Sequence, residues 1–280
     1  MLLTGVNDFN FTASNLGTRT ESLAGTAVTA AGTAHTKGAS VTLLSGATVT
    51  SDVYGIAIGV VGGSLSAAAR LFMLDLMIDP AGGTAWSVLI NNLAFHCVSM
   101  LQGGSWYYFP IYLRAGTSLG ARIQCNTASI ALRCIVQVWG EPSEPSLVHV
   151  GSRIFTFGAV PASTTGTAIT PGSNGVVGAY TASLGTTTAH LWWWQLGILI
   201  NDTSQTAVQY LTDVDAGDAT NKKNCRSGSI LSNAGTAEQT GFRASGLGLP
   251  IRKMASGSNV YARGSCTGTP DSACSVVVYG

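Results

Sequence analysis

The sequence predicts an all-β protein made of two tandem jelly-roll-like β-sandwich domains related by internal duplication, and three observations carry this prediction. First, one stretch occurs twice: residues 109–140 read FPIYLRAGTSLGARIQCNTASIALRCIVQVWG, and residues 249–280 read LPIRKMASGSNVYARGSCTGTPDSACSVVVYG. Second, short runs rich in Val, Ile, Thr and aromatic residues are bounded by turn signals about every 8–12 residues. Third, Gly is frequent, at 35 of 280 residues, and helical periodicity is nearly absent.

The two copies of the repeated stretch share an Ala-Arg pair, two cysteines and an aromatic residue followed by Gly, in the same order. The aligned pairs are Arg122 with Arg263, Cys125 with Cys266, and Cys134 with Cys274. Such self-similarity indicates an internal duplication, which decides the fold of the whole chain.

The chain divides into an extended N-terminal arm at residues 1–20 and two sandwich domains at residues 21–142 and 143–280. The boundary falls at the Pro/Glu cluster of residues 141–145. Arms of this kind are ordered when they dock on something, so we expect a partner surface for this one.

The elements of the first half follow from apolar runs between Gly and Pro turns. Residues 22–51 are rich in Ala, Thr, Gly and Val, which favours strands over helices. Residues 79–83 (DPAGG) form a turn, and residues 86–95 are short and apolar, typical of either a strand or a brief helix. The expected strands are residues 53–61, 69–78, 110–113, 120–125 and 130–139.

In the second half, the apolar run at residues 191–198 lies 120 positions after the run at residues 71–78, whereas the two tails are offset by about 140. We therefore expect an insertion of about twenty residues within the polar segment 201–248, where function diverges most readily. On the 120-residue offset, the counterparts of Asp75 and Asp79 are Gln195 and Leu199.

The chain carries few charges, and this bounds its partners. Charged residues make up 10% and the net charge is +1, against about 25% charged residues in an average protein. This balance excludes nucleic acid and an anionic membrane as partners. No apolar run reaches the ~20 residues of a membrane span, and the N-terminus lacks a signal-peptide pattern. So few surface charges favour contacts with other protein chains.

The six cysteines (97, 125, 134, 225, 266 and 274) have no zinc-site spacing. Two pairs lie across short extended segments and are candidates for hairpin-type disulfides if the mature protein meets an oxidising medium: Cys125 with Cys134, and Cys266 with Cys274. The alternative is that all four are buried thiols.

Two aromatic clusters are candidate binding surfaces: Trp106, Tyr107 and Tyr108, and Trp192, Trp193 and Trp194. Aromatic faces suit sugar rings, and some jelly rolls are lectins. The competing interpretation is a core or subunit interface, because successive strand residues alternate between faces.

Other chemical patterns favour structural roles. Asp213, Asp215 and Asp218 resemble a calcium loop but lack the EF-hand order, so we expect a solvated polar loop and no metal. The GTSLG stretch at residues 116–120 matches G-x-S-x-G but is followed by another strand instead of a helix, so it predicts a turn. The four histidines (35, 96, 149 and 190) are dispersed along the chain.

The chain resembles a family of duplicated all-β proteins of tailed bacteriophages. The shared features are DPAGG at residues 79–83, LINNL at 89–93 and FPIYLRAGTSLGAR at 109–122, echoed by TPG at 170–172, GDATNKK at 217–223 and a terminal strand ending in Val-Tyr-Gly. The similarity covers about four-fifths of the chain. It implies a structural virion component with tandem jelly-roll-like domains and no catalytic residues.

We therefore expect a non-enzymatic virion protein without cofactors, made in the host bacterial cytoplasm. The first expectation is a capsid decoration or cement protein, an oligomer and by analogy a trimer, that binds the major capsid protein or other virion proteins by burying low-charge β faces. The alternative is a head-fibre or tail adhesin that binds a host glycan or receptor. An enzyme would need paired carboxylates at a cleft, for which Asp75 and Asp79 are the candidates.

Overall fold

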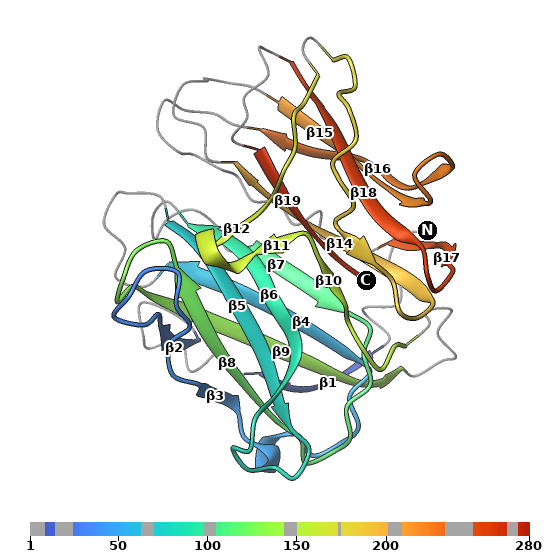
Figure 1. Cartoon of the computed structure of the whole chain (residues 1–280). Coiled ribbons are helices and arrows are strands. Elements are labelled where there is room, and N and C mark those ends of the chain that lie inside the picture. Colours follow the sequence, from blue (N-terminus) through green and yellow to red (C-terminus); the bar gives the residue numbers. More distant parts are fainter. Residues whose placement is uncertain are drawn as a thin grey trace.

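The protein is all-β, as the sequence predicts. The computed structural model describes residues 9–14, 25–62, 70–97, 105–142, 150–172, 175–200, 209–232, 249–267 and 274–280. Their regular elements are strands apart from two short 3-10 turns, η2 (Gly46–Thr48) and η3 (Pro161–Ser163). Figure 1 shows the strands grouped into two bodies, one above the other.

The first body is a sandwich of two antiparallel sheets. One sheet contains β1 (Phe9–Ser14), β2 (Thr26–Thr29), β4 (Gly55–Gly62), β7 (Ser105–Phe109) and β9 (Ala131–Pro142); the other contains β3 (Val41–Leu44), β5 (Arg70–Asp79), β6 (Ser87–Cys97) and β8 (Ser118–Cys125). Their orders are β2–β9–β4–β7 and β3–β8–β5–β6. Eight strands in these orders make a jelly roll, with the chain crossing repeatedly between the sheets.

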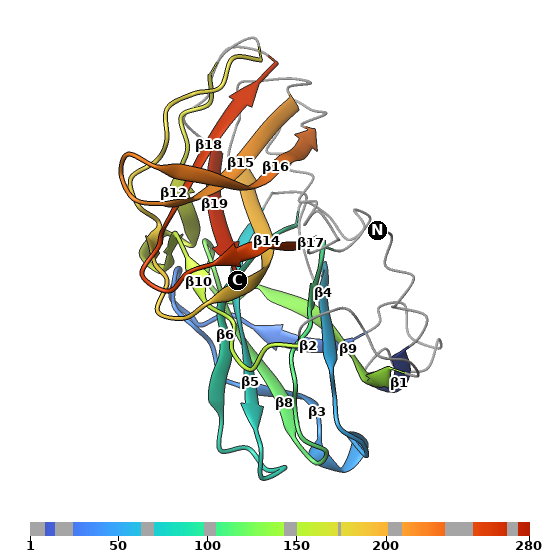
Figure 2. The ribbon, with the colours of Figure 1, turned by 90° about the vertical axis from the view of Figure 1, so that its right-hand side faces the viewer.

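The core of this sandwich follows from the period of two along its strands. In β4, Ile56, Ile58 and Val60 point inward and are fully buried, while Ala57 and Gly59 face the other side. In β9, Leu132, Cys134, Val136 and Val138 likewise point inward. Figure 2 shows the two sheets edge-on, with β4 and β9 on one side and β5 and β8 on the other.

The second body is built from the remaining strands. They are β10 (Thr156–Phe157), β11 (Ala159–Val160), β12 (Thr165–Ala168), β13 (Gly185–Thr186), β14 (Leu191–Ile200), β15 (Gln209–Gly217), β16 (Lys222–Ser232), β17 (Leu249–Met254), β18 (Asn259–Cys266) and β19 (Cys274–Tyr279). Its sheets run β11–β12–β19–β14–β17 and β13–β18–β15–β16.

The second sandwich repeats the strand order of the first, with β12 to β19 in the places of β2 to β9. The registers repeat as well: Asp75 lies opposite Arg122 between β5 and β8, and Asp213 lies opposite Arg263 between β15 and β18. The alignment of Arg122 with Arg263 thus joins structurally equivalent positions. This repetition is what a duplication predicts, while common descent of the halves stays a prediction.

The match of residues 191–198 to residues 71–78 is wrong. β14 lies between β19 and β17, as β4 lies between β9 and β7, so β14 corresponds to β4. The segment expected as an insertion, residues 201–248, contains β15 and β16, the counterparts of β5 and β6. The two apolar runs look alike because β5 is buried on both faces along nearly its whole length, and β14 is buried on both faces at residues 195–197, although Trp192 near its start is exposed.

The N-terminal arm contributes a strand to the first sandwich. β1 pairs with residues 137–142 of β9, and β2 pairs with residues 131–134, so the two lie end to end along one edge of β9. The expected docking surface of residues 9–14 is therefore within the same chain. Residues 1–8 and 15–20 lie outside the described residues.

Two other expectations about elements are settled. Of residues 86–95, left open between helix and strand, all but the first belong to strand β6. Residues 110–113 form isolated bridges, Ile111 with Gly151 and Val53 with Leu113, whereas the strand is β7 just before them, at the aromatic run. Within the described part of the chain, no helix is long and apolar enough to cross a membrane.

The two sandwiches share a buried contact at β19. Val276 and Val278 point into the second core, while Val277 and Tyr279, on the opposite face of the strand, join the first core. Every residue from Val276 to Tyr279 is fully buried. A strand covered on both faces loses its polar alternation, which explains the apolar run that closes the repeat.

Tyr279 fits between β6 and β7 of the first sandwich. Its hydroxyl accepts the N–H of Ala94 at 2.7 Å and donates to the C=O of Asn92 at 2.9 Å. Its ring lies edge-on to Tyr107 and Phe109, with centroids 5.3 and 6.3 Å apart. Burial raises the pKa of Tyr279, so the hydroxyl stays protonated and can donate.

Candidate binding cleft at the junction of the two sandwiches

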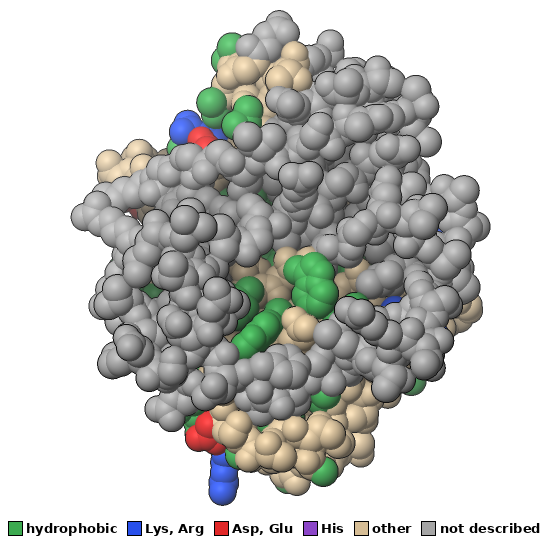
Figure 3. Space-filling model, turned by 180° about the vertical axis from the view of Figure 1, so that it is seen from behind, with side chains coloured by type: hydrophobic (Ala, Val, Ile, Leu, Met, Phe, Trp, Pro, Cys, Tyr) green, Lys and Arg blue, Asp and Glu red, His purple; other side chains and the backbone are tan. Residues whose placement is uncertain are grey.

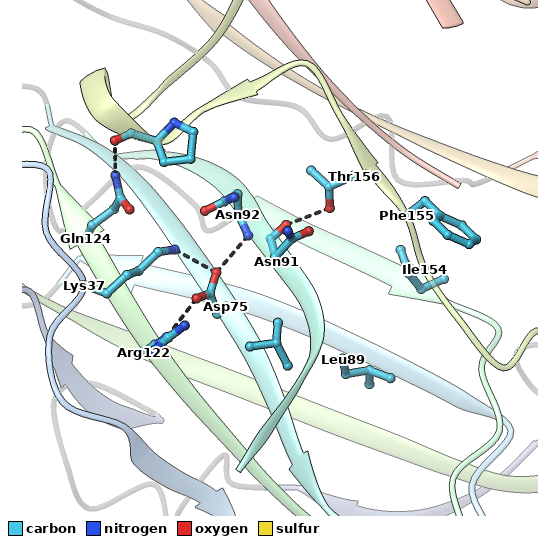
Figure 4. A pocket seen from close by; sticks show the side chains of 12 residues that line it. Lys37, Asp75, Leu89, Asn91, Asn92, Arg122, Gln124, Ile154, Phe155 and Thr156 are labelled. Atoms are coloured by element: carbon cyan, nitrogen blue, oxygen red, sulfur yellow. Dashed lines mark hydrogen bonds and ion pairs between the residues drawn. The ribbon is translucent and has the colours of Figure 1, made fainter. Parts of the chain in front are cut away.

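A cleft of about 640 Å³ lies on the outer face of sheet β3–β8–β5–β6, where the chain leading into the second sandwich crosses it. We call it the junction cleft. Its lining residues are Lys37, Asp75, Val88, Leu89, Asn91, Asn92, Arg122, Gln124, Ile154, Phe155, Thr156 and Pro161. Figure 4 shows the polar residues gathered on one side, with Leu89, Ile154 and Phe155 on the other.

Asp75 is the centre of the polar side. One carboxylate oxygen accepts hydrogen bonds from Lys37 Nζ at 2.8 Å and from the backbone N–H of Asn92 at 2.9 Å. The other oxygen accepts a hydrogen bond from Arg122 Nε at 2.8 Å. Asp75 is 3% exposed, so these partners offset the cost of removing its charge from water. Lys37 also donates to the C=O of Met73 at 3.0 Å.

Burial and the neighbouring charges together determine the protonation states of Asp75 and Lys37. Burial raises the pKa of Asp75, but the charge and hydrogen bond of Lys37, the Asn92 N–H and the hydrogen bond from Arg122 together hold that pKa below its ordinary value. Burial lowers the pKa of Lys37, and Asp75 opposes the effect only in part. Asp75 is therefore an anion at neutral pH, and the cluster with Lys37 and Arg122 carries an excess of one positive charge.

Hydrogen bonds hold the segment that crosses the sheet, residues 156–164, to strands β8 and β6 of the first sandwich. Gln124 Nε2 donates to the C=O of Pro161 at 2.6 Å and to Thr164 Oγ1 at 2.9 Å. The hydroxyl of Thr156 donates to the C=O of Asn91 at 2.7 Å. These contacts hold the crossing segment on the sheet face, so the cleft is largely pre-formed, as small-ligand sites usually are.

Asp79, the second carboxylate considered for catalysis, does not face the cleft. Its oxygens accept the N–H groups of Ala81 and Ala85 at 2.9 and 2.8 Å, which closes the turn after β5. By register with β8 and β18, the counterpart of Asp75 is Asp213, not Gln195, and that of Asp79 is Gly217, not Leu199.

The second sandwich carries a related but covered cluster. Arg263 Nε lies 3.4 Å from Asp213 and 3.9 Å from Asp215, and the guanidinium carbon lies 4.7 Å from the ring centre of Tyr180. Lys222 Nζ is 4.9 Å from the same ring centre. The Asp–Arg pair thus recurs at the same register, but an aromatic ring lies over it.

The three aspartates considered for a metal do not converge. Asp213 and Asp215 face Arg263, whereas Asp218 accepts hydrogen bonds from Thr220 and Asn221 within an exposed turn. Among the described residues, no group of three or more His, Cys, Asp or Glu side chains is placed to hold a metal ion.

Cys125 and Cys134 do not form a hairpin pair. Cys125 lies in β8 and Cys134 in β9, and these strands belong to opposite sheets of the sandwich. Both are buried and present as thiols, as is Cys266. Burial raises the pKa of the Cys125 thiol, which makes it unreactive. The side chain of Cys274 lies outside the described residues, so the second pair stays untested.

The first aromatic cluster divides between the two faces of β7. Tyr107 is fully buried and donates its hydroxyl to the C=O of Ala94 at 2.6 Å. Trp106 and Tyr108 face outward, and Trp106 is 37% exposed. Burial raises the pKa of Tyr108 to about 12. The alternation expected for a strand is therefore present, with one member in the core.

Glycines on β4 form the floor under these outward rings. A Cβ at Gly59 would lie 2.5 Å from the Trp106 indole, and one at Gly55 would lie 2.5 Å from the Tyr108 hydroxyl. Trp139 lies edge-on to Tyr108, with centroids 5.9 Å apart. We call the surface formed by Trp106, Tyr108 and Trp139 the aromatic face. Figure 3 views the molecule from behind and shows hydrophobic side chains near the centre of the described surface.

The second cluster lies on β14. Trp192 is 41% exposed, and the side chains of Trp193 and Trp194 lie outside the described residues. The next residue, Gln195, bonds with both backbone groups of Tyr108, accepting its N–H at 3.3 Å and donating to its C=O. This amide covers the free edge of β7, which would otherwise offer unpaired backbone groups.

The remaining sequence patterns have structural roles. Ser118 of the G-x-S-x-G match is 1% exposed, accepts the N–H of Gly46 at 2.8 Å and begins a strand, so it is no nucleophile elbow. His35 bonds to Thr164 at 3.0 Å, and His190 accepts the N–H of Ser256 at 3.3 Å. The side chains of His96 and His149 lie outside the described residues.

Comparisons with known proteins give no family. No protein-family model and no curated protein matches the chain. Among solved structures, PNGF-II matches 91% of this chain at 9% identity and a TM-score of 0.38. The tandem CBM22-1–CBM22-2 domain of Paenibacillus barcinonensis Xyn10C matches 96% of this chain and 95% of its own length at 11% identity and a TM-score of 0.28. The chain spans 65% of PNGF-II. Likenesses this weak carry no argument.

The junction cleft is the feature that sequence reasoning missed. Arg122 and Gln124 lie two residues apart on β8, Lys37 lies in the loop before β3, and only the register of β5 with β8 brings Arg122 to Asp75. One signal was present: an Asp in a buried strand requires a cation, and Arg122 was already singled out by the repeat.

Proposed function

We propose that this chain is a non-catalytic receptor-binding module on the exterior of a bacteriophage particle, and that its ligand is a host glycan. The resemblance to duplicated phage proteins supports the setting. The junction cleft supports the binding role: it is pre-formed, lies between two domains, and its ~640 Å³ falls within the ~300–1,000 Å³ typical of small-ligand sites.

The chemistry of the cleft favours binding over catalysis. A general acid or base works best with a pKa near the operating pH. The pKa of Asp75 is instead held low, and both carboxylate oxygens are occupied by Lys37, Arg122 and the Asn92 N–H. Asp75 thus orients two cations instead of exchanging a proton.

The test is adsorption of the purified full chain to host cells. Fluorescently labelled protein should bind intact cells, and mild periodate oxidation of their surface sugars should abolish the binding, whereas protease treatment of the cells should not. Binding that survives periodate but not protease would refute a glycan ligand. Absence of binding to any host cell would refute the receptor-binding role.

A second candidate is capsid decoration, and the aromatic face favours it. Trp106, Tyr108 and Trp139 form an apolar surface with little charge, which would suit burial on the major capsid protein at about 25 cal/mol per Å² of apolar area. Immunoelectron microscopy of virions separates the candidates: label spread evenly over the head favours decoration, and label confined to tail or fibres favours the adhesin. Under decoration, capsids lacking the protein should lose DNA at lower temperature, and the free protein should sediment as an oligomer, by expectation a trimer.

A further inference from the structure

The polar side of the junction cleft offers hydrogen-bond donors but few acceptors. The carboxylate of Asp75 is taken up by Lys37, Arg122 and the Asn92 N–H. Arg122 uses only Nε in this contact, and its two Nη groups make no hydrogen bond to the described residues, with 38% of the side chain exposed. A ligand entering the cleft therefore meets a free guanidinium edge beside an ammonium group.

The opposite side of the cleft suits the face of a sugar ring. Val88 is 45% exposed, and Leu89 and Ile154 are partly buried beside it. The exposed amide of Asn91 lies at the boundary between the two sides and can both donate and accept, as vicinal hydroxyl groups require. The site therefore combines an apolar surface, amide groups and a cationic end. A complementary ligand is a ring that carries hydroxyl groups and one anionic group.

We infer that the junction cleft binds an acidic sugar, such as a uronate or sialate unit, with its carboxylate on the Nη groups of Arg122 and its ring against Leu89 and Ile154. This rests on the proposed glycan-binding function and specifies its ligand class. Arg122 is suited to the role because its planar fork matches a carboxylate in two parallel hydrogen bonds, while Asp75 fixes the third nitrogen.

The second sandwich supplies a matched control. Arg263 occupies the same register on β18 as Arg122 on β8 and pairs with Asp213. Its guanidinium lies against the ring of Tyr180 at 4.7 Å, and so it does not present an open fork. Loss of its side chain should leave glycan binding unchanged.

The experiment is isothermal titration of the full chain with three acidic oligosaccharides, containing glucuronate, galacturonate or N-acetylneuraminate, and with their carboxyl-reduced counterparts. We expect at least one acid to bind and its reduced form to bind about 10- to 100-fold more weakly, the usual loss for a charged hydrogen-bond pair. Arg122→Gln should lose a similar factor, Arg122→Lys less, and Arg263→Gln less than about 2-fold.

The comparison of each acidic sugar with its reduced form uses the native chain. It therefore tests whether the cleft recognises the sugar carboxylate even if the Arg122→Gln protein fails to fold. Equal binding of acidic and reduced sugars would overturn the inference and leave the glycan-binding function standing. If none of the six oligosaccharides binds but adsorption to cells is periodate-sensitive, the inference of an acidic ligand is overturned and the glycan-binding function stands. If neither the oligosaccharides nor the cells bind the protein, the proposed function is overturned as well.

Discussion

Replacing Tyr279 by Phe tests the contact that joins the two sandwiches. The ring and its edge-on contacts with Tyr107 and Phe109 would remain, so the change isolates the hydroxyl. Without it, the buried N–H of Ala94 loses its acceptor and the C=O of Asn92 loses a donor. An unsatisfied buried polar group costs about 1–3 kcal/mol, so the free energy of unfolding should fall by about 2–4 kcal/mol.

The assay is differential scanning calorimetry, supported by urea unfolding. At about 2–4 °C per kcal/mol for a chain of this size, Tm should fall by roughly 4–16 °C. Tyr112→Phe is the control: its hydroxyl donates to Asp52 at 3.0 Å, but the residue is 43% exposed, so the change should stay within about 0.5 kcal/mol. A Tyr279→Phe protein with the same Tm as the Tyr112→Phe protein would refute the reasoning.

Three further predictions concern charge, packing and thiols. Asp75→Asn removes the counter-charge of buried Lys37 and should cost about 2–4 kcal/mol at pH 7, between the values for exposed and buried pairs. Because the folded pKa of Asp75 lies below the unfolded value of about 3.9, the wild type loses this contribution as pH falls below about 4, and the difference in urea midpoint should shrink at pH 3; a pH-independent difference would contradict this. Gly59→Ala places a Cβ 2.5 Å from the Trp106 ring and should cost about 1–3 kcal/mol with a shift in tryptophan emission, whereas Gly32→Ala, with nothing within 4 Å, should do neither. The three described thiols should resist alkylation until the chain is unfolded, and reductant should not lower Tm; a drop in Tm with reductant would indicate a disulfide.

Local pattern predicted the strands well, because burial imposes its period directly on the sequence. The apolar run at residues 53–61 predicted β4, in which Ile56, Ile58 and Val60 prove to point inward, and the Ala-Arg…Cys repeat aligned β8 with β18 correctly. These signals lie within a single strand, where each side chain reports which face is covered.

The pairing of elements between the halves was harder to predict. β5 is buried on two faces and carries no alternation, so residues 191–198 matched residues 71–78 on hydrophobicity alone. That error hid the equivalence of Asp75 with Asp213 and made two core strands look like an insertion. The junction cleft depends on the same non-local register, and on a crossing segment whose position only the packing of the two sandwiches determines.

The place of Tyr279 in the first core has a consequence for the order of events during synthesis. Ala94 and Tyr279 lie 185 positions apart, so at about 5–20 residues per second the ribosome needs roughly 10–40 s to make the second after the first. Throughout that interval the first half lacks Val277 and Tyr279, whose side chains belong to its core. The N-terminal sandwich therefore completes its core only after the end of the chain has emerged, and we expect it to be prone to aggregation until then.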